Sequence, residues 1–123
     1  MKKILILGGG FSGIYAAKSL SKFNNKKMDI ELISDNNYFI FQPLLPEVAS
    51  GTINSSDAVT PIRQLLKGIK YRNAEVSKLD VINKKITILQ GFKKSSHNIS
   101  YDHLVIALGQ VSNLEIVKGL KDH

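Results

Sequence analysis

The 123-residue sequence predicts an α/β fold with a central parallel sheet and a small antiparallel β-meander. Two short runs, residues 4–7 and 104–108, are apolar at every position, which is typical of parallel strands buried on both faces. Between them, residues 75–89 alternate apolar and polar side chains, as antiparallel strands do. The first run leads directly into a glycine-rich turn and a helical pattern, so it begins a β-α-β unit.

The glycine-rich turn, residues 8–13 (GGGFSG), fits the pattern G-x-G-x-x-G. Strand, glycine turn and helix in this order are the context in which the pattern binds a dinucleotide. Gly8 allows the tight turn, Gly10 lets a pyrophosphate approach the backbone, and Gly13 lets helix and strand pack closely. Backbone N–H groups and the positive dipole end at the helix start then hold the phosphates.

The helix and the second strand follow. Apolar residues recur at helical spacing at Ile14, Ala17 and Leu20, and Phe23 extends this spacing. Residues 30–33 (IELI) predict a strand, which pairs in parallel with the first strand through a right-handed crossover. Asp35 lies 35 − 13 = 22 residues after the last glycine of the turn. This is close to the roughly 20 residues expected for the acid that binds a ribose diol. An ordinary turn aspartate is the alternative, and the glycine turn favours the ribose-binding interpretation.

Residues 38–51 (YFIFQPLLPEVASG) are strongly apolar, but their two prolines exclude a regular helix or a central strand. The segment is either a buried loop or short helix that closes the core, or a wall around a flat apolar ligand. Beyond it, an apolar stripe predicts a helix that starts near Thr60, because Pro61 is tolerated only in the first turn, and that stops at Gly68. Residues 69–71 are a short strand candidate.

The meander is expected to turn at residues 83–85 and to return through residues 86–89. Residues 91–98 predict a polar hairpin loop with a solvated His97, after which residues 100–102 complete three strands. The apolar strand at residues 104–108 ends at Gly109, which therefore falls at the same end of the sheet as the glycine turn. Ligands of open α/β sheets bind at this end.

Composition narrows the classes of partner. The net charge is +7, from 17 lysines and arginines against 10 acids, but the lysines are scattered in pairs. This favours a solvated surface over a nucleic-acid footprint, with attraction to an anionic membrane surface as a minor alternative. The absence of cysteine excludes disulfides and thiol chemistry within this chain. No run approaches the roughly 18 apolar residues of a membrane span or the 7–15 of a signal peptide, so we expect a cytoplasmic location.

Four segments together resemble the N-terminal part of the flavin-dependent pyridine nucleotide oxidoreductases, and most closely the type II NADH dehydrogenases, the single-subunit NADH:quinone oxidoreductases. Residues 4–17 (ILILGGGFSGIYAA) are similar to that family's FAD fingerprint. Within residues 35–51, YFIFQPLLPEVASG resembles the segment that the family passes beside the flavin. Within residues 57–66, TPIRQLL resembles the helix that follows, and residues 101–109 (YDHLVIALG) resemble a strand motif that ends in A-T-G in many relatives.

The resemblance implies a Rossmann-like FAD-binding domain, of which residues 1–123 would be an incomplete N-terminal portion. It implies FAD as the cofactor, NADH as the co-substrate of the complete enzyme and quinone as the electron acceptor. By position, the resemblance assigns the pyrophosphate of FAD to Gly8, Gly9, Gly10, Phe11, Ser12 and Gly13, with Ala107 and Gly109 closing the pyrophosphate side. It assigns the adenosine ribose to Asp35 with Ser34, and the adenine to the main chain of Val76. It assigns the ribityl–flavin part to Gln42 and Pro43.

Leu108 replaces the threonine of the commoner A-T-G pattern, so any hydroxyl contact there is lost. No residue is a convincing general acid or base, and no metal site is implied, which suits a reaction that the flavin performs. In the family, a second glycine fingerprint for NADH, a later G-D motif and the membrane-associating segment all lie further along the chain. The sequence therefore resembles about the first third of such an enzyme, and residues 1–123 alone are expected to be inactive.

Three alternatives stay open. A sulfide:quinone oxidoreductase is close, and the absence of its reactive cysteines argues only weakly against it, because some of them lie later than residue 123. A non-catalytic module that binds NAD, FAD or another nucleotide is a second class, and a basic nucleic-acid-binding domain is a third.

A half-built parallel sheet would also expose an edge strand and apolar surface, which predicts self-association. The complete enzyme is expected to lie peripherally on the cytoplasmic face of a membrane.

Overall fold

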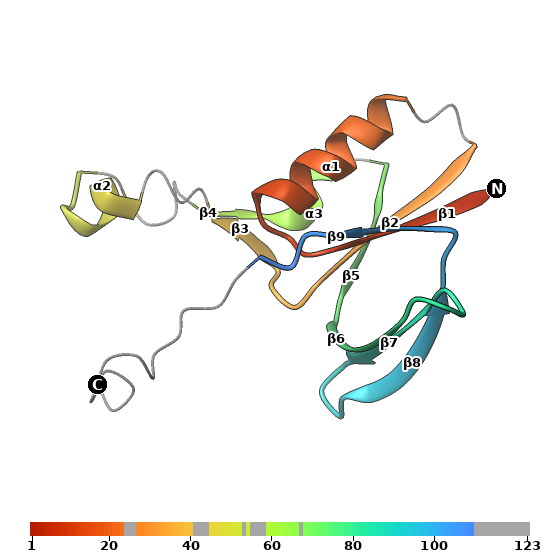
Figure 1. Ribbon diagram of the computed structural model, residues 1–123. Coiled ribbons are helices and arrows are strands. Elements are labelled where there is room, and N and C mark those ends of the chain that lie inside the picture. The colour runs from red at the N-terminus through yellow and green to blue at the C-terminus, as the bar shows by residue number, and fades with distance from the viewer. Residues whose placement is uncertain (24–26, 41–44, 53, 55–58, 67, 110–123) are drawn as a thin grey trace.

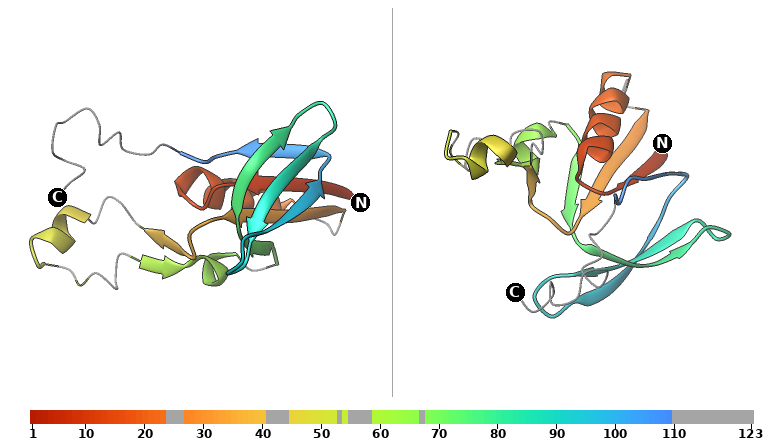
Figure 2. Two further views of the ribbon diagram at one scale, coloured as in Figure 1. Left: turned by 90° about the horizontal axis from the view of Figure 1, so that it is seen from below. Right: turned by 60° about the vertical axis from the view of Figure 1, so that its left-hand side comes forward.

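The computed structural model describes residues 1–23, 27–40, 45–52, 54, 59–66 and 68–109. Within these residues, a four-stranded sheet is covered by one helix on one face and by a three-stranded antiparallel sheet on the other (Figures 1 and 2). The predicted α/β fold, with its central parallel sheet and small meander, is confirmed.

The parallel sheet has the strand order β5-β2-β1-β9. β1 (Lys2–Leu7) continues through α1 (Phe11–Lys22) into β2 (Met28–Ser34), and the two strands pair in parallel, as predicted. β5 (Lys70–Asn73) pairs with the outer side of β2, and β9 (His103–Ile106) pairs with the other side of β1. Leu7 is paired with Ile33 of β2 and with Ile106 of β9, so the carboxyl ends of three strands meet at one level.

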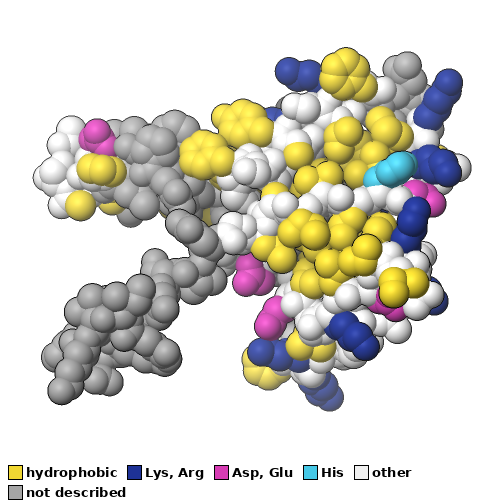
Figure 3. Space-filling view, in the orientation of Figure 1, with side chains coloured by type: hydrophobic (Ala, Val, Ile, Leu, Met, Phe, Trp, Pro, Cys, Tyr) yellow, Lys and Arg dark blue, Asp and Glu magenta, His cyan; other side chains and the backbone are white. Residues whose placement is uncertain are grey.

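The strand at residues 104–108 was predicted to be buried on both faces, as a central strand is, and this is wrong within the described part of the chain. β9 is the edge strand of the four-stranded sheet and ends at Ile106. Ile106 is 60% exposed and Leu108 is 58% exposed. Figure 3 shows hydrophobic side chains gathered across the middle of the face on which β9 lies. The continuous apolar run therefore includes side chains that no described element covers.

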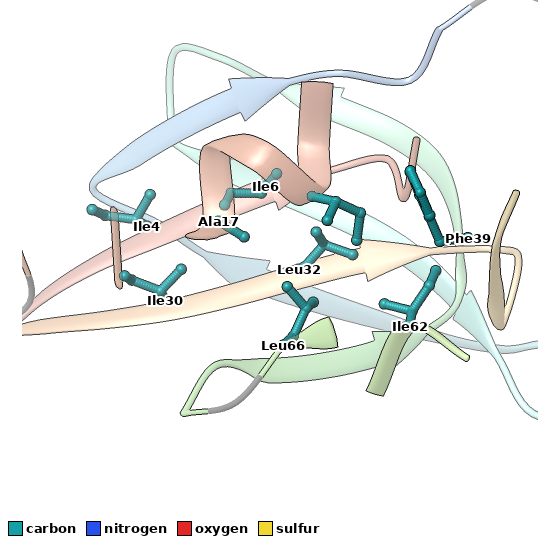
Figure 4. Packing of buried hydrophobic residues seen from close by; sticks show 9 residues of the cluster. Ile4, Ile6, Ala17, Ile30, Leu32, Phe39, Ile62 and Leu66 are labelled. Carbon is teal, nitrogen blue, oxygen red and sulfur yellow. The ribbon is translucent and has the colours of Figure 1, made fainter. Parts of the chain in front are cut away.

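Side chains alternate between the two faces of the sheet and build two hydrophobic clusters. On the helix side, Ile6 and Leu32 pack against Ile14 and Ala17 of α1 (Figure 4). All four are at most 2% exposed, and each large side chain buried in this way contributes roughly 1.5–3 kcal/mol. Phe23 follows the end of α1 and is 78% exposed, so it does not extend the predicted stripe.

The meander covers the opposite face. Its strands are β6 (Glu75–Asp80), β7 (Lys85–Gln90) and β8 (Ser95–Ser100). Ile86, Ile88 and Ile99 pack in one cluster with Leu5 and Leu7 of β1. The predicted loop over residues 91–98 is wrong in extent, because its second half is β8. Only Ile99 of β8 is buried, so the strand lacks the apolar alternation from which it could have been predicted.

Residues 38–66 contain a two-stranded antiparallel sheet of β3 (Tyr38–Ile40) and β4 (Val59–Pro61) and two short helices, α2 (Leu45–Ala49) and α3 (Ile62–Leu65). The helix predicted to start near Thr60 is present but starts later and is shorter, because residues 59–61 pair with β3 and Pro61 is extended, with ψ at 130°. α3 is a single turn that starts at Ile62, whose N–H donates to the Asn37 carbonyl oxygen at 2.8 Å.

Two polar contacts fasten the ends of the parallel strands. The Lys3 N–H donates to Asp102 Oδ2 at 2.7 Å, and the Asp102 N–H donates to the Lys3 carbonyl oxygen at 2.9 Å. The first of these bonds holds the pKa of Asp102 below its ordinary value, because it favours the ionised carboxylate. They join the start of β9 to β1 at the end of the sheet opposite the glycine turn.

Candidate functional site

A groove of about 900 Å³ lies at the carboxyl ends of β1, β2 and β9. Its lining comes from residues 8–12, 33–36, 38, 74–76 and 106–109. These segments leave their strands at the same level because Leu7 is paired with both Ile33 and Ile106. The groove therefore lies at the end of the sheet where the sequence predicts the ligand.

Gly8 fits between the exits of two neighbouring strands. Its N–H donates to the Ile33 carbonyl oxygen at 2.8 Å, and the Ala107 N–H donates to the Leu7 carbonyl oxygen at 2.8 Å. The φ angle of Gly8 is +113°, and a Cβ atom there would lie 2.0 Å from the Ala107 carbonyl oxygen. Only glycine satisfies both conditions, so the tight turn predicted at Gly8 also makes room for the backbone of Ala107, which follows β9.

Gly9 and Gly13 are packing residues. A Cβ atom on Gly13 would lie 1.8 Å from the Gly8 carbonyl oxygen, which agrees with the predicted close contact between helix and strand. A Cβ atom on Gly9 would lie 2.7 Å from both Ile62 Cδ1 and Ser34 Oγ. Gly9 lines the groove, whereas Gly13 does not. Gly13 was predicted to be a binding residue, but in the structure it packs against the turn outside the groove lining.

Gly10 faces open space at the start of α1. Its φ angle is −84°, and a Cβ atom there would meet no other atom within 4 Å. The α1 hydrogen-bond ladder begins with the Ile14 N–H, which donates to the Gly10 carbonyl oxygen at 3.0 Å. No side chain caps the helix start, and its first turn carries no acidic residue. This helix end, with Phe11 and Ser12 on the groove wall, is suited to an anionic group.

Ser34 and Asp35 stand on the opposite wall, at the end of β2. Ser34 is 5% exposed, and its Oγ accepts a hydrogen bond from the Asn36 N–H at 3.2 Å. Asp35 is exposed, and none of the salt bridges among the described residues involves its carboxylate. That carboxylate contributes to raising the pKa of Tyr71, although burial is the larger cause and Arg63 acts against both.

The meander and the residues after β9 close the sides of the groove. The Ala74 N–H donates to the Ser34 carbonyl oxygen at 3.0 Å, which places Val76 of β6 beside the end of β2. β6 is irregular between Val76 and Lys78 in its pairing with β7. Ala107 and Gly109 line the groove from the other side.

Most of the predicted binding residues meet in this groove. Those that line it are Gly8, Gly9, Gly10, Phe11, Ser12, Ser34, Asp35, Val76, Ala107 and Gly109. Gln42 and Pro43 lie outside the described residues. Reasoning from the sequence missed further lining residues: Ile33, Asn36, Tyr38, Ala74, Glu75, Ile106 and Leu108. Ile33 and Ile106 could have been found from the strand register, because they pair with the residue just before the glycine turn.

The lining has the chemistry of a binding site. Backbone amides, a helix start and an exposed carboxylate face one space, whereas within the described residues no group of three or more potential metal-ligating acids and histidines occurs. This arrangement matches the expectation of a dinucleotide fingerprint, in which the backbone holds phosphates and an acid holds a ribose. Comparison with known proteins gives the family.

Residues 2–123 match the pyridine nucleotide-disulphide oxidoreductase family. The chain belongs to this family. It is 37% identical over 131 residues to the external alternative NAD(P)H-ubiquinone oxidoreductase B4, mitochondrial, of Arabidopsis thaliana, covering 99% of this chain and 22% of that protein. It is 35% identical over 125 residues to the type II NADH:quinone oxidoreductase of Staphylococcus aureus, covering 99% of this chain and 30% of that protein.

Solved structures of this family agree. NDH2 from Plasmodium falciparum in complex with NADH superposes with a TM-score of 0.84 at 31% identity, over 99% of this chain and 25% of the other. The sulfide:quinone oxidoreductase from Aquifex aeolicus gives a TM-score of 0.76 at 31% identity, over 89% of this chain and 24% of the other. The resemblance to type II NADH dehydrogenases drawn from four sequence segments is confirmed. The chain spans roughly a quarter of the length of these family members.

None of the helices in the described part of the chain is long and apolar enough to span a membrane.

Proposed function

We propose that this chain is the FAD-binding N-terminal part of an NADH:quinone oxidoreductase, which transfers electrons from NADH through FAD to a quinone. The main observation that supports this proposal is that the glycine turn, Asp35, Val76 and the residues after β9 all line one groove. Residues 1–123 would form the N-terminal portion of an FAD-binding domain. Family membership and the similarity to type II NADH:quinone oxidoreductases support the redox part of the proposal.

The residues present fit FAD. The open space in front of Gly10 and the uncapped start of α1 suit a pyrophosphate, which would be flanked by Ala107 and Gly109. The Asp35 carboxylate would accept hydrogen bonds from the adenosine ribose, with Ser34 beside it. The main chain of Val76 would meet the adenine. Gln42 and Pro43 are assigned to the ribityl–flavin part by resemblance alone.

A bound flavin would supply the redox chemistry, and this chain's residues would bind and orient it. The complete protein would lie peripherally on the cytoplasmic face of a membrane. It would attach there through the family's membrane-associating segment, which lies further along the chain. We assign no general acid or base to residues 1–123. The titratable side chains that line the groove are Asp35, Tyr38 and Glu75, and among the described residues the one salt bridge that involves them joins Glu75 to Lys94.

A sulfide:quinone oxidoreductase is the second candidate within the same class. The observation in its favour is the likeness to the Aquifex aeolicus enzyme, which reaches the same 31% identity as the Plasmodium falciparum structure but over less of this chain. A stand-alone nucleotide-binding module is the candidate from another class, and it would use the same groove without catalysis.

The experiment is a binding titration of the purified chain, preceded by its absorbance spectrum. We expect a flavin band or saturable binding of FAD, and we expect Asp35→Asn to weaken FAD binding about tenfold, which corresponds to about 1.4 kcal/mol. Asp80→Asn is the matched control, because Asp80 ends β6 away from the groove. Binding of NADH without flavin would indicate the module instead, and binding of neither would refute the proposal.

A further inference from the structure

The loop after β2, residues 35–37, is held by its neighbours although it lies on the surface. All three residues are exposed. Nevertheless, the Tyr71 hydroxyl donates to the Asn36 carbonyl oxygen at 2.7 Å, and the Ile62 N–H donates to the Asn37 carbonyl oxygen at 2.8 Å. We call residues 35–37 the Asp35 loop. Its backbone is thus tied to β5 and to the first residue of α3.

β5 supplies a second tie through Asn73. With its amide oriented so that Nδ2 faces the end of β2, Asn73 donates to the Ser34 and Asp35 carbonyl oxygens at 3.1 and 3.2 Å. Asn73 is paired with Ser34 in the strand register, and Tyr71 is paired with Leu32. Both side chains therefore reach the Asp35 loop from the strand beside it.

The packing of the Tyr71 ring places its hydroxyl group at the Asp35 loop. Its ring packs against the hydrophobic cluster on the α1 side of the sheet, and the Arg63 guanidinium lies 5.5 Å from the ring centroid. Burial, with the nearby Asp35 charge, raises the pKa of Tyr71 against the opposing effect of Arg63. The hydroxyl group acts as a hydrogen-bond donor to the Asp35 loop. Phenylalanine would keep the ring contacts and lose only the bonds of the hydroxyl, which donates to the Asn36 carbonyl oxygen and, at 3.4 Å, to Asn37 Oδ1.

The Asp35 carboxylate has no salt bridge within the described residues, so its position depends on the backbone that carries it. We propose that Tyr71 is a positioning residue, which fixes the Asp35 loop so that the Asp35 carboxylate faces the groove and receives the 2′,3′-diol of an adenosine. The ligand class is a nucleotide with a free ribose diol. This inference rests on the proposed function, because it takes the adenosine end of FAD as the occupant.

The first test concerns the loop without any ligand. Backbone amide relaxation by NMR would be compared between the parent chain and Tyr71→Phe. We expect the order parameters of residues 35–37 to fall from the rigid range, about 0.85, towards the flexible range below about 0.6. Tyr101→Phe is the matched control, because it deletes the same atom from a residue that follows β8 at the opposite end of the sheet. Unchanged order parameters in Tyr71→Phe would overturn the inference.

The second test uses ADP and inorganic pyrophosphate as probes. Losing one hydrogen bond of this kind is worth about 0.5–1.5 kcal/mol, so we expect Tyr71→Phe to weaken ADP binding roughly two- to tenfold and to leave pyrophosphate binding unchanged. In an Asp35→Asn background, Tyr71→Phe should cause no further loss for ADP. Equal loss for both probes, or the same loss in both backgrounds, would show a general structural role and overturn the inference.

The two proposals fail in different ways. If the parent chain binds neither FAD nor ADP, the proposed function fails. Loss of order in the Asp35 loop of Tyr71→Phe would still support Tyr71 as the residue that positions this loop. If the parent chain binds both nucleotides and Tyr71→Phe binds ADP equally well, the proposed function stands and the positioning role is refuted.

Discussion

Gly10 and Gly13 belong to one sequence pattern but meet opposite surroundings. A Cβ atom on Gly13 would lie 1.8 Å from a backbone oxygen that cannot rotate away, whereas one on Gly10 would meet nothing within 4 Å. The φ angle of Gly10, −84°, is also one that alanine adopts without strain. Gly13 is therefore needed by the fold, whereas the space in front of Gly10 stays open to a ligand in the groove.

We expect Gly13→Ala to lower the free energy of unfolding by about 3 kcal/mol or more, because the helix must move away from β1. Gly10→Ala should leave stability within about 0.5 kcal/mol of the parent and weaken FAD binding roughly tenfold, because its methyl group occupies the space of the pyrophosphate. Urea denaturation and an FAD titration measure the two effects. Gly51→Ala is not a suitable control because its φ is positive, so Ser19→Ala, at an exposed position of α1 outside the groove lining, serves as the control for both measurements. Equal destabilisation by both glycine variants would contradict the assignment.

At the level of single residues, the sequence predicted the roles of residues that follow a spacing rule and missed the roles of residues that depend on a contact distant in the sequence. The spacing of the glycines and the distance to Asp35 are such rules, and these residues line the groove or pack beneath it. The contact of Gly9 with Ile62 joins segments more than 50 residues apart, and nothing near either residue indicates it. Tyr71 was only part of a short strand candidate, since no local pattern shows where its hydroxyl reaches.

β5 is the element through which the sheet, the meander and the Asp35 loop are connected. While Tyr71 faces the α1 side, Arg72 faces the meander. Its Nε donates to Glu31 Oε1 at 2.6 Å, and its Nη1 donates to Gln90 of β7 at 3.3 Å. The Glu31 side chain is only 4% exposed and also lies 3.4 Å from Lys3 Nζ. A buried carboxylate in β2 thus depends on cations from β1 and β5.

We expect Arg72→Met to lower the free energy of unfolding by about 2 kcal/mol. Loss of one partner of a buried ion pair costs 3–5 kcal/mol in general, and here Lys3 remains and a third of Arg72 is solvent-exposed, which reduces the cost. Urea denaturation at low ionic strength measures the effect, since salt would screen the remaining pair.

The double variant Glu31→Leu/Arg72→Met separates the charge from the packing. Removing both members should recover stability to within about 1 kcal/mol of the parent chain, because no uncompensated charge stays buried. Lys70→Met is the matched single control, as Lys70 pairs with Asp29 in the same sheet but is 69% exposed. If the double variant is less stable than Arg72→Met, the loss arises from packing rather than from the buried carboxylate.

Elements with a strong apolar pattern were predicted, and elements formed by polar residues were not. The β-α-β unit at residues 2–34 follows from continuous apolar runs and a helical stripe. β8 was predicted as a loop because its pairing with β7 depends on the backbone ladder and on one bond between Thr87 and Asn98, 2.8 Å long. β4 was predicted as the first turn of a helix, since its apolar spacing also fits a helix and its partner β3 lies 21 residues earlier, with Phe39 paired to Thr60.

For the whole molecule, β9 leaves the sheet unfinished within the described residues. Its exposed Ile106 and the following Leu108 line the groove on one side. Figure 3 shows hydrophobic side chains gathered on the face that β9 crosses. An exposed edge strand with apolar side chains is a surface for further pairing. This agrees with the finding that the chain spans only 22% and 30% of two of its relatives. Self-association of the isolated chain stays a prediction.

Under the proposed function, the groove would hold the adenosine and pyrophosphate of one dinucleotide, and the 123 residues contain a single G-x-G-x-x-G pattern. A hydride transfer from NADH needs a second site that holds the nicotinamide against the flavin, since the reacting atoms must be about 3–3.5 Å apart. We therefore expect the purified chain, supplied with saturating FAD, to reduce a soluble quinone with NADH no faster than the same concentration of free FAD does. Oxidation of NADH followed by absorbance measures this, with the Staphylococcus aureus type II NADH:quinone oxidoreductase as the positive control. Steady turnover above the level of free FAD would show that residues 1–123 hold the nicotinamide as well, and it would refute both the inactivity of the chain and the limited role given to its groove.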